Sequence, residues 1–128
     1  MFAAKTLAMF IAAAAVPLAA ASPTNNTVIQ ADFWGQFCDD TGCSQNCSGS
    51  VRISNPGCLN QIGRQSIRFH GPDIGRRDYS LVASPSGDCP CQDACLTIPT
   101  NITCWDISNH QNALSFRFIS GHCDSDDC

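Results

Sequence analysis

Glutamate is absent from this chain of 128 residues, and its eleven acidic residues are all aspartates. Lysine occurs once, at Lys5, and the formal net charge is −4 at pH 7. An acidic balance of this kind argues against non-specific binding to nucleic acid. A G-x-S-x-G nucleophile elbow is also missing, so this signature of a serine hydrolase is not found. After residue 21, no apolar run is long enough to span a bilayer.

The N-terminal segment contains the one long apolar run. Lys5 precedes an apolar stretch from Thr6 to Ala21 that ends in three alanines. A positive charge, a hydrophobic stretch and a small-residue cleavage site are typical of a secretory signal peptide. The alternative, a transmembrane anchor, needs roughly 20 apolar residues, and Pro17 and Pro23 cut this run short. We predict a secreted, extracellular protein whose mature chain has no lysine or methionine.

Composition divides the chain into three segments. We expect the signal peptide over residues 1–21, a flexible polar leader over 22–30 and a single disulfide-rich β domain over 31–128. Glycosylation sequons at Asn25 and Asn101 are consistent with an exported glycoprotein.

Ten cysteines follow the signal segment, a density typical of disulfide scaffolds. An even number behind an export signal predicts five disulfides, because an exported thiol meets oxidising conditions and a short chain buries only a modest core. A zinc site is the alternative, but the C-x3-C and C-x-C spacings differ from the C-x2-C spacing of structural zinc sites. We predict no metal and no other cofactor. The cysteines expected in disulfides are Cys38, Cys43, Cys47, Cys58, Cys89, Cys91, Cys95, Cys104, Cys123 and Cys128.

The domain repeats itself with a period of about 48 residues. The aligned segments are 43–47 with 91–95, 51–53 with 96–98, 65–71 with 114–121 and, more loosely, 33–37 with 79–83. We predict repeat one over about 31–71, repeat two over about 77–121 and an acidic tail over 122–128. Chance similarity among cysteine-rich segments is the alternative.

The hydrophobic pattern predicts strands. Ile67 and Phe69 alternate with Ser66 and Arg68, as expected for a strand with one buried face, and residues 114–118 alternate in the same way. Two units of about four short strands predict an all-β fold, a small disulfide-stapled β-sandwich built from two related, Greek-key-like repeats. Short helical turns are expected at the two C-x3-C segments, because cysteines at i and i+4 share one face of a helix.

The internal repeat also predicts that the two halves carry matching disulfides. The pairing that we expect is Cys47 with Cys58 and Cys95 with Cys104. Other connectivities stay open, because ten cysteines can pair in many ways.

Three short stretches resemble the βγ-crystallin superfamily. They are RQSIRF at residues 64–69, NALSFRF at 112–118 and FWG at 33–35. The resemblance implies a double Greek key, and the superfamily includes small secreted microbial toxins and inhibitors. Its calcium site needs paired acidic or amide residues shortly before a Ser-Ser or Thr-Ser pair. The corresponding positions of this chain hold other residues, namely Gln61-Ile62 before Gln65-Ser66 and His110-Gln111 before Leu114-Ser115. No calcium site is implied.

The export signal, the ten cysteines and the lack of lysine in the mature chain also resemble the small secreted cysteine-rich proteins of filamentous fungi. Many of those proteins are effectors or elicitors that act on a plant host, and others are antimicrobial toxins. The resemblance implies a non-catalytic binding protein, an effector or elicitor in the extracellular space of a host. The alternatives are an antimicrobial or killer-type toxin and a small secreted hydrolase or ribonuclease.

The candidate binding residues are basic and aromatic. Arg64, Arg68, Arg76 and Arg77 are close together in the sequence and predict a local basic face on an acidic protein. Such a face suits lipid headgroups, acidic polysaccharide or the carboxylates of a partner, and internal pairing with aspartates is the alternative. Trp34 is a binding anchor if its side chain is exposed. We expect a monomer that binds an extracellular protein, glycan or membrane surface of a host or competitor, and no nucleic acid.

Catalysis is the weaker hypothesis. His70 and His122 together with an aspartate could carry out acid–base hydrolysis of RNA, but no recognisable ribonuclease motif surrounds them. With every cysteine paired, no thiol nucleophile is left. We predict no catalytic residues. The aspartates of the tail could hold a hard cation, and the simpler interpretation is a solvated acidic terminus.

Overall fold

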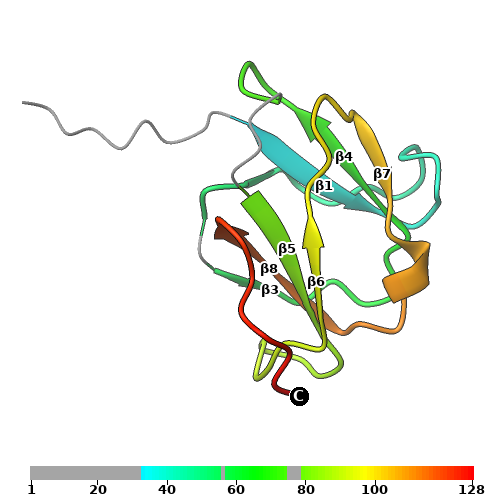
Figure 1. Ribbon diagram of the computed structural model, residues 1–128. Coiled ribbons are helices and arrows are strands. Elements are labelled where there is room, and N and C mark those ends of the chain that lie inside the picture. The colour runs from blue at the N-terminus through cyan, green and yellow to red at the C-terminus, as the bar shows by residue number, and fades with distance from the viewer. Residues whose placement is uncertain (1–32, 56, 75–78) are drawn as a thin grey trace, which may run out of the picture.

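The computed structural model describes residues 33–55, 57–74 and 79–128. The predicted signal peptide and polar leader, together with Asn25, Arg76 and Arg77, lie outside these residues. Within them, eight strands form two four-stranded antiparallel sheets that pack into a sandwich (Figure 1). No helix of the described residues has both the length and the apolar character needed to cross a membrane. The predicted all-β, sandwich-like fold is confirmed.

Each sheet contains three strands of one half of the chain and one strand of the other. The first sheet has the order β2 (Val51–Arg52), β1 (Trp34–Cys38), β4 (Ser66–His70) and β7 (Cys104–Asp106). The second sheet has the order β3 (Cys58–Leu59), β8 (Ser115–Ser120), β5 (Tyr79–Ser84) and β6 (Ala94–Thr97). The third strand of each half, β3 or β7, has crossed to the other sheet. The two related four-strand repeats are present, as predicted, and this exchange interlocks them.

Strand alternation places one face of each sheet in a shared core. Ile67 and Phe69 of β4 are buried, while the residues that follow each of them are exposed. Phe116 and Phe118 of β8 take the same positions in the second sheet and are also buried. The rings of Phe37 and Phe116 meet across the sandwich with their centroids 5.3 Å apart. Burying one side chain of this size stabilises the fold by about 1.5 to 3 kcal/mol.

The two halves share hydrogen bonds at equivalent positions. The Ser66 hydroxyl donates to the carbonyl of Asp40, and the Ser115 hydroxyl donates to the carbonyl of Ser86, each at 2.5 Å. Both serines are fully buried at the start of the last strand of their half. Each ties that last strand to the turn that follows the first strand. The turns after β1 and β5 are therefore held in the same way.

Five disulfides join all ten cysteines, as predicted. The pairs are Cys38–Cys47, Cys43–Cys104, Cys58–Cys89, Cys91–Cys128 and Cys95–Cys123. The predicted pairs Cys47–Cys58 and Cys95–Cys104 are wrong. Cys58 and Cys104 lie on the exchanged strands β3 and β7, so the cysteine that bonds to each belongs to the other half of the chain.

Two of these disulfides are equivalent to each other. Cys43 follows β1 and bonds to Cys104 on β7, and Cys89 follows β5 and bonds to Cys58 on β3. Cys43 and Cys89 also share a positive φ, of 57° and 51°. The counterpart of Cys43 is therefore Cys89, whereas the alignment of the two C-x3-C segments had matched it to Cys91.

The helical turns predicted at 43–47 and 91–95 are absent. Cys43 and Asn46 have φ values of 57° and 45°, which a right-handed helix excludes. In the second segment β6 already begins at Ala94. The one helix among the described residues is the 3-10 helix η1 (Ser108–His110), which lies between β7 and β8.

The C-terminal tail, red in Figure 1, runs along the second sheet. Its two cysteines bond to Cys91, three residues before β6, and to Cys95, the second residue of β6. The Ser80 hydroxyl on β5 donates to the carbonyl of Gly121 at 2.8 Å. Ser80 and Val82 point away from the core, yet they are only 1% and 2% exposed. The tail thus covers part of the outer surface of this sheet.

A buried glutamine anchors the end of the tail. The Gln92 side-chain amide donates to the carbonyl of Asp124 at 2.7 Å and to the carboxylate of Asp126 at 2.8 Å. Its backbone N–H donates to the carboxylate of Asp127 at 2.6 Å. These bonds satisfy a polar residue that is only 8% exposed.

The disulfides of the exchanged strands should contribute more stability than the most local one. Replacing Cys43 and Cys104 by alanine opens a loop of 61 residues, and replacing Cys38 and Cys47 opens one of 9. Chain entropy predicts losses of about 4 kcal/mol and about 2.5 kcal/mol in the free energy of unfolding. Urea unfolding of the two double variants measures both losses. Equal losses, or a larger one for the short loop, would contradict this prediction.

Asp40 organises the turn after β1. Its carboxylate accepts hydrogen bonds from the Ser44 hydroxyl at 2.7 Å, and from the backbone N–H groups of Ser44 and Gln45 at 2.9 Å each. The Ser44 hydroxyl, followed by the N–H of Gln45, lowers the pKa of Asp40 from 3.8 to about 2. A lowered pKa means that this stabilisation is fully present above the ordinary pKa and is lost as the pH falls through about 2.

An NMR titration of the Asp40 carboxyl carbon tests this arrangement. We expect a midpoint near 2 in the natural protein and a shift back toward 3.8 in the Ser44→Ala variant. The Ser50→Ala variant removes a hydroxyl that does not contact Asp40, and it should leave the midpoint unchanged. An unchanged midpoint in Ser44→Ala would show that the hydroxyl is not the main cause.

Candidate functional site

The outer face of the first sheet carries a cluster of cationic, aromatic and amide side chains, which we call the cationic face. It consists of Trp34 and Gln36 on β1, Arg52 on β2, and Arg68 and His70 on β4. Strand alternation turns these five side chains away from the core. The two arginines and the histidine are exposed, and the other two residues are partly exposed.

Three of these side chains form a row across the strands. The register places Trp34 between Arg52 on one side and His70 on the other. The guanidinium carbon of Arg52 lies 5.6 Å from the centroid of the indole ring. The imidazole of His70 stacks on the same ring with a centroid distance of 5.8 Å and an interplanar angle of 19°. The neighbours of Trp34 therefore approach its ring from both adjacent strands.

A second set of contacts orients the rest of the face. Gln36 Oε1 accepts hydrogen bonds from Nε and Nη2 of Arg68 at 2.9 and 2.6 Å, and Gln36 Nε2 donates to the carbonyl of Ser48 at 3.1 Å. The Ser50 hydroxyl is 2.9 Å from Nε2 of His70. Because these side chains are already positioned, a ligand would not have to order them.

The equivalent face of the second sheet is different. Aligning the halves on β4 and β8 places Ser80, Thr97 and Ile119 where the first sheet has its row of tryptophan, arginine and histidine. Ser80 is covered and bonds to Gly121, the residue that precedes the tail. The two sheets share a backbone frame, but within the described residues the exposed row of charged and aromatic side chains belongs to the first.

Charge is distributed unevenly over the first sheet. The row that contains Trp34 lies at the N-terminal end of β1, and Asp39 and Asp106 lie at the opposite end of the sheet. Asp73 follows β4 three residues after His70. The Ser108 hydroxyl and backbone N–H bind the Asp106 carboxylate and hold its pKa below the usual value of 3.8. On a chain of net charge −4, the cationic face thus concentrates local positive charge.

The structure brings together two of the predicted binding residues. Trp34 and Arg68 lie in adjacent rows of the cationic face. Arg64 precedes β4, and its guanidinium is used inside the molecule, 2.9 Å from the carboxylate of Asp39 and 2.7 Å from the carbonyl of Asn46. Arg64 does not join this face. The two other predicted arginines lie outside the described residues.

Trp105 and Asn101 do not belong to the cationic face. Trp105 packs on Phe69 with a centroid distance of 6.3 Å and belongs to the rim of the core. Asn101 is exposed in the connection between β6 and β7, so its sequon is accessible.

The three histidines do not form one site. His70 lies on the cationic face, His110 in η1, and His122 in the tail that follows β8 of the other sheet. In the part of the chain that the structure describes, no group of three or more histidine, cysteine or acidic side chains could hold a metal ion.

Arg52, Gln36 and His70 also belong to the face, and they were not predicted as binding residues from the sequence. Arg52 and His70 are neighbours of Trp34 only through the register of β1 with β2 and β4. The available signal was the alternation of β4, which places His70 on the same face as Arg68.

Comparison of the chain with models of protein families, with curated proteins and with solved structures found no match.

A double-mutant cycle tests the row that contains Trp34. In unfolding experiments on Trp34→Ser, Arg52→Thr and the double variant, we expect a coupling of about 0.5 to 1 kcal/mol, the range for a cation over an exposed indole. The serine and threonine are the residues that the second sheet carries at these positions. A matched cycle of Trp34 with Arg64 should give a coupling near zero. A coupling that is equally small in both cycles would contradict the contact.

Proposed function

We propose that this chain is a secreted, non-catalytic binding protein, and that the cationic face is the surface that contacts its partner. The observation that carries the proposal is the ordered row of guanidinium, indole and imidazole on an otherwise acidic molecule. Five disulfides are compatible with an extracellular protein.

The chemistry of the face favours an anionic partner. Arg52 and Arg68 lie on opposite sides of β1 and in different rows. The exposed guanidinium of Arg68 is the group that we propose contacts the partner. Guanidinium groups recognise carboxylate, sulfate and phosphate by directed hydrogen bonds. The fixed contacts of Gln36 and Trp34 reduce the entropy that these side chains lose on binding.

The same geometry disfavours two other kinds of partner. A single-stranded nucleic acid needs a free aromatic platform for its bases, and the ring of Trp34 is already flanked by two side chains. Insertion into a membrane needs exposed apolar side chains. The large exposed hydrophobic residues among those described are Ile62 and Leu114, which lie at the other end of the sandwich.

The biological role that we propose is that of a fungal effector or elicitor in the extracellular space of a host. The predicted export signal, the density of cysteines and the resemblance to small secreted cysteine-rich proteins of filamentous fungi support this role. A killer-type toxin would use the same scaffold against a competing microbe. The arrangement of two interlocked four-strand units supports a relationship to the double Greek key of the βγ-crystallin superfamily, which includes secreted toxins and inhibitors.

Application of the purified, oxidised protein to plant leaf tissue and to fungal and bacterial cultures tests this proposal. We expect an immune response in the leaf that is lost after reduction and alkylation. It should fall several-fold in the Arg68→Gln variant. Arg117→Gln is the matched control, because Arg117 has the same place on β8 that Arg68 has on β4 and the variant loses the same charge.

Inhibition of fungal or bacterial growth without an immune response in the leaf would contradict the effector role and support that of a toxin. Equal responses to Arg68→Gln and Arg117→Gln would show that the cationic face is not the contact surface. Circular dichroism of each variant confirms that the comparison is made between folded proteins.

A further inference from the structure

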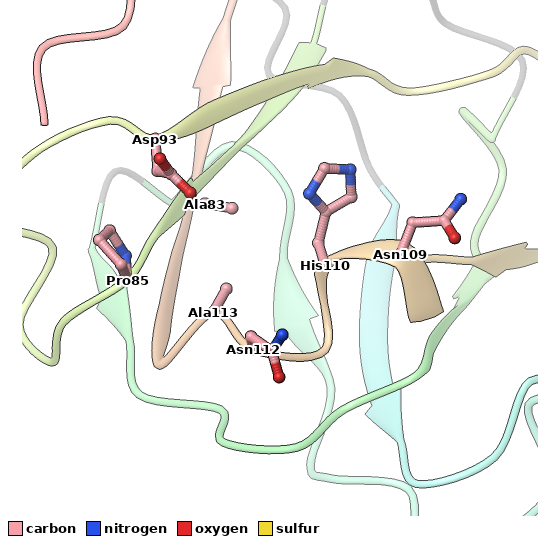
Figure 2. Close-up of a pocket in the computed structure, with 7 residues that line it drawn as sticks. All are labelled: Ala83, Pro85, Asp93, Asn109, His110, Asn112 and Ala113. Carbon is pink, nitrogen blue, oxygen red and sulfur yellow. The ribbon is translucent and has the colours of Figure 1, made fainter.

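A cleft of about 180 Å³ lies beside the end of β5, separate from the cationic face. Ala83, Pro85 and Ala113 provide the apolar part of its lining. Figure 2 shows Asp93 on one side of this cleft and His110 on the other. The cleft is smaller than the pockets of about 300 to 1,000 Å³ that enclose drug-sized ligands, so it suits a single small chemical group.

The equivalent place in the first half of the chain is filled by Arg64. Aligning β4 with β8 puts Arg64 at the position of Ala113, and aligning β1 with β5 puts Asp39 at the position of Pro85. The guanidinium of Arg64 lies 2.9 Å from the Asp39 carboxylate. In the second half, both members of this ion pair are replaced by small apolar residues. The cleft is the space that this replacement leaves.

The rim of the cleft carries new polar groups in place of the lost ion pair. The connection from β7 to β8, residues 107–114, is longer than the one from β3 to β4, residues 60–65, and it contains η1 with Asn109 and His110. Asp93 and Asn112 complete the rim. Within the described part of the chain, the side chains of Asp93, Asn109 and Asn112 form no hydrogen bonds to the protein. Their oxygens can accept hydrogen bonds from a ligand.

Backbone hydrogen bonds fix the elements that carry these groups. The N–H of Asp93 donates to the carbonyl of Ala83 at 2.9 Å, which joins the start of β6 to β5. On the other side, the N–H of His110 donates to the carbonyl of Ile107 at 2.8 Å, and the N–H of Ala113 donates to the carbonyl of His110 at 2.9 Å. Both sides of the cleft are thus positioned before any ligand binds.

The charge around the cleft selects the ligand. Gln92, adjacent to Asp93, is held by the carboxylates of Asp126 and Asp127, so acidic groups stand on the rim and close to it in the tail. An anion is repelled there, and a cation with several N–H donors is favoured. We propose that the cleft binds a guanidinium group, the side chain of an arginine in a partner peptide or protein, where the first half holds its own Arg64.

Titration with the peptide acetyl-Gly-Arg-Gly-amide, followed by amide NMR of the oxidised protein, tests this site. We expect saturable shifts at the rim residues with a dissociation constant on the order of 1 mM, because one exposed ion pair is weak. The peptide with citrulline in place of arginine has nearly the same shape without the charge, and it should give no saturable shift.

Three variants locate the binding. Asp93→Asn should lower the affinity for the arginine peptide about fivefold, the effect of losing one exposed ion pair. Asp124→Asn removes the same charge from the tail and should leave the affinity unchanged. Ala113→Arg should abolish binding, because its own guanidinium fills the cleft as Arg64 does in the other half.

The proposal would be overturned if the citrulline peptide bound equally well, if no rim residue shifted, or if Asp124→Asn weakened binding as much as Asp93→Asn. The peptide comparison and the two aspartate variants decide the matter even if Ala113→Arg fails to fold.

Discussion

The exchange of β3 and β7 between the two sheets is the constraint on which the rest of this structure depends. Each exchanged strand is very short, of 2 or 3 residues, and a disulfide ties each to the turn after the first strand of the other half, as Cys58–Cys89 and Cys43–Cys104. With these strands in place, each sheet reaches four strands and both inner faces meet in one core. A short chain that buries a modest core gains much of its stability from such bridges.

Because the halves share a frame, their differences mark the candidate sites. The outer row of the first sheet holds Trp34 where the second sheet holds Ser80, and the tail covers Ser80. The cleft is found in the second half, which has the small Ala113 where the first half has Arg64. One surface is therefore cationic and the other is acidic, and a single acidic protein can offer distinct groups to two partners.

The sequence predicted the strands well where alternation was strong, as over Ser66–His70 and Ser115–Ser120, and it predicted that all cysteines pair. It did not predict the pairing, because strand exchange depends on contacts between the halves that no local pattern encodes. The prediction of a helical turn at Cys43 was wrong for a local reason, because Cys43 has a positive φ. The cationic face was predicted only in part, because the register between strands decides which residues lie beside Trp34. Arg64 was predicted to bind a partner, but its guanidinium pairs with Asp39 inside the molecule.

Disulfide mapping tests the interlocked frame most directly. Digestion of the unreduced protein with trypsin and an Asp-directed protease releases residues 53–64, which contain Cys58 as their one cysteine. Mass spectrometry should find this peptide linked to residues 88–92, which contain Cys89 and Cys91 of the second half, as strand exchange requires. A link to the peptide that contains Cys43 and Cys47 would confine the bridge to the first half and contradict the exchange.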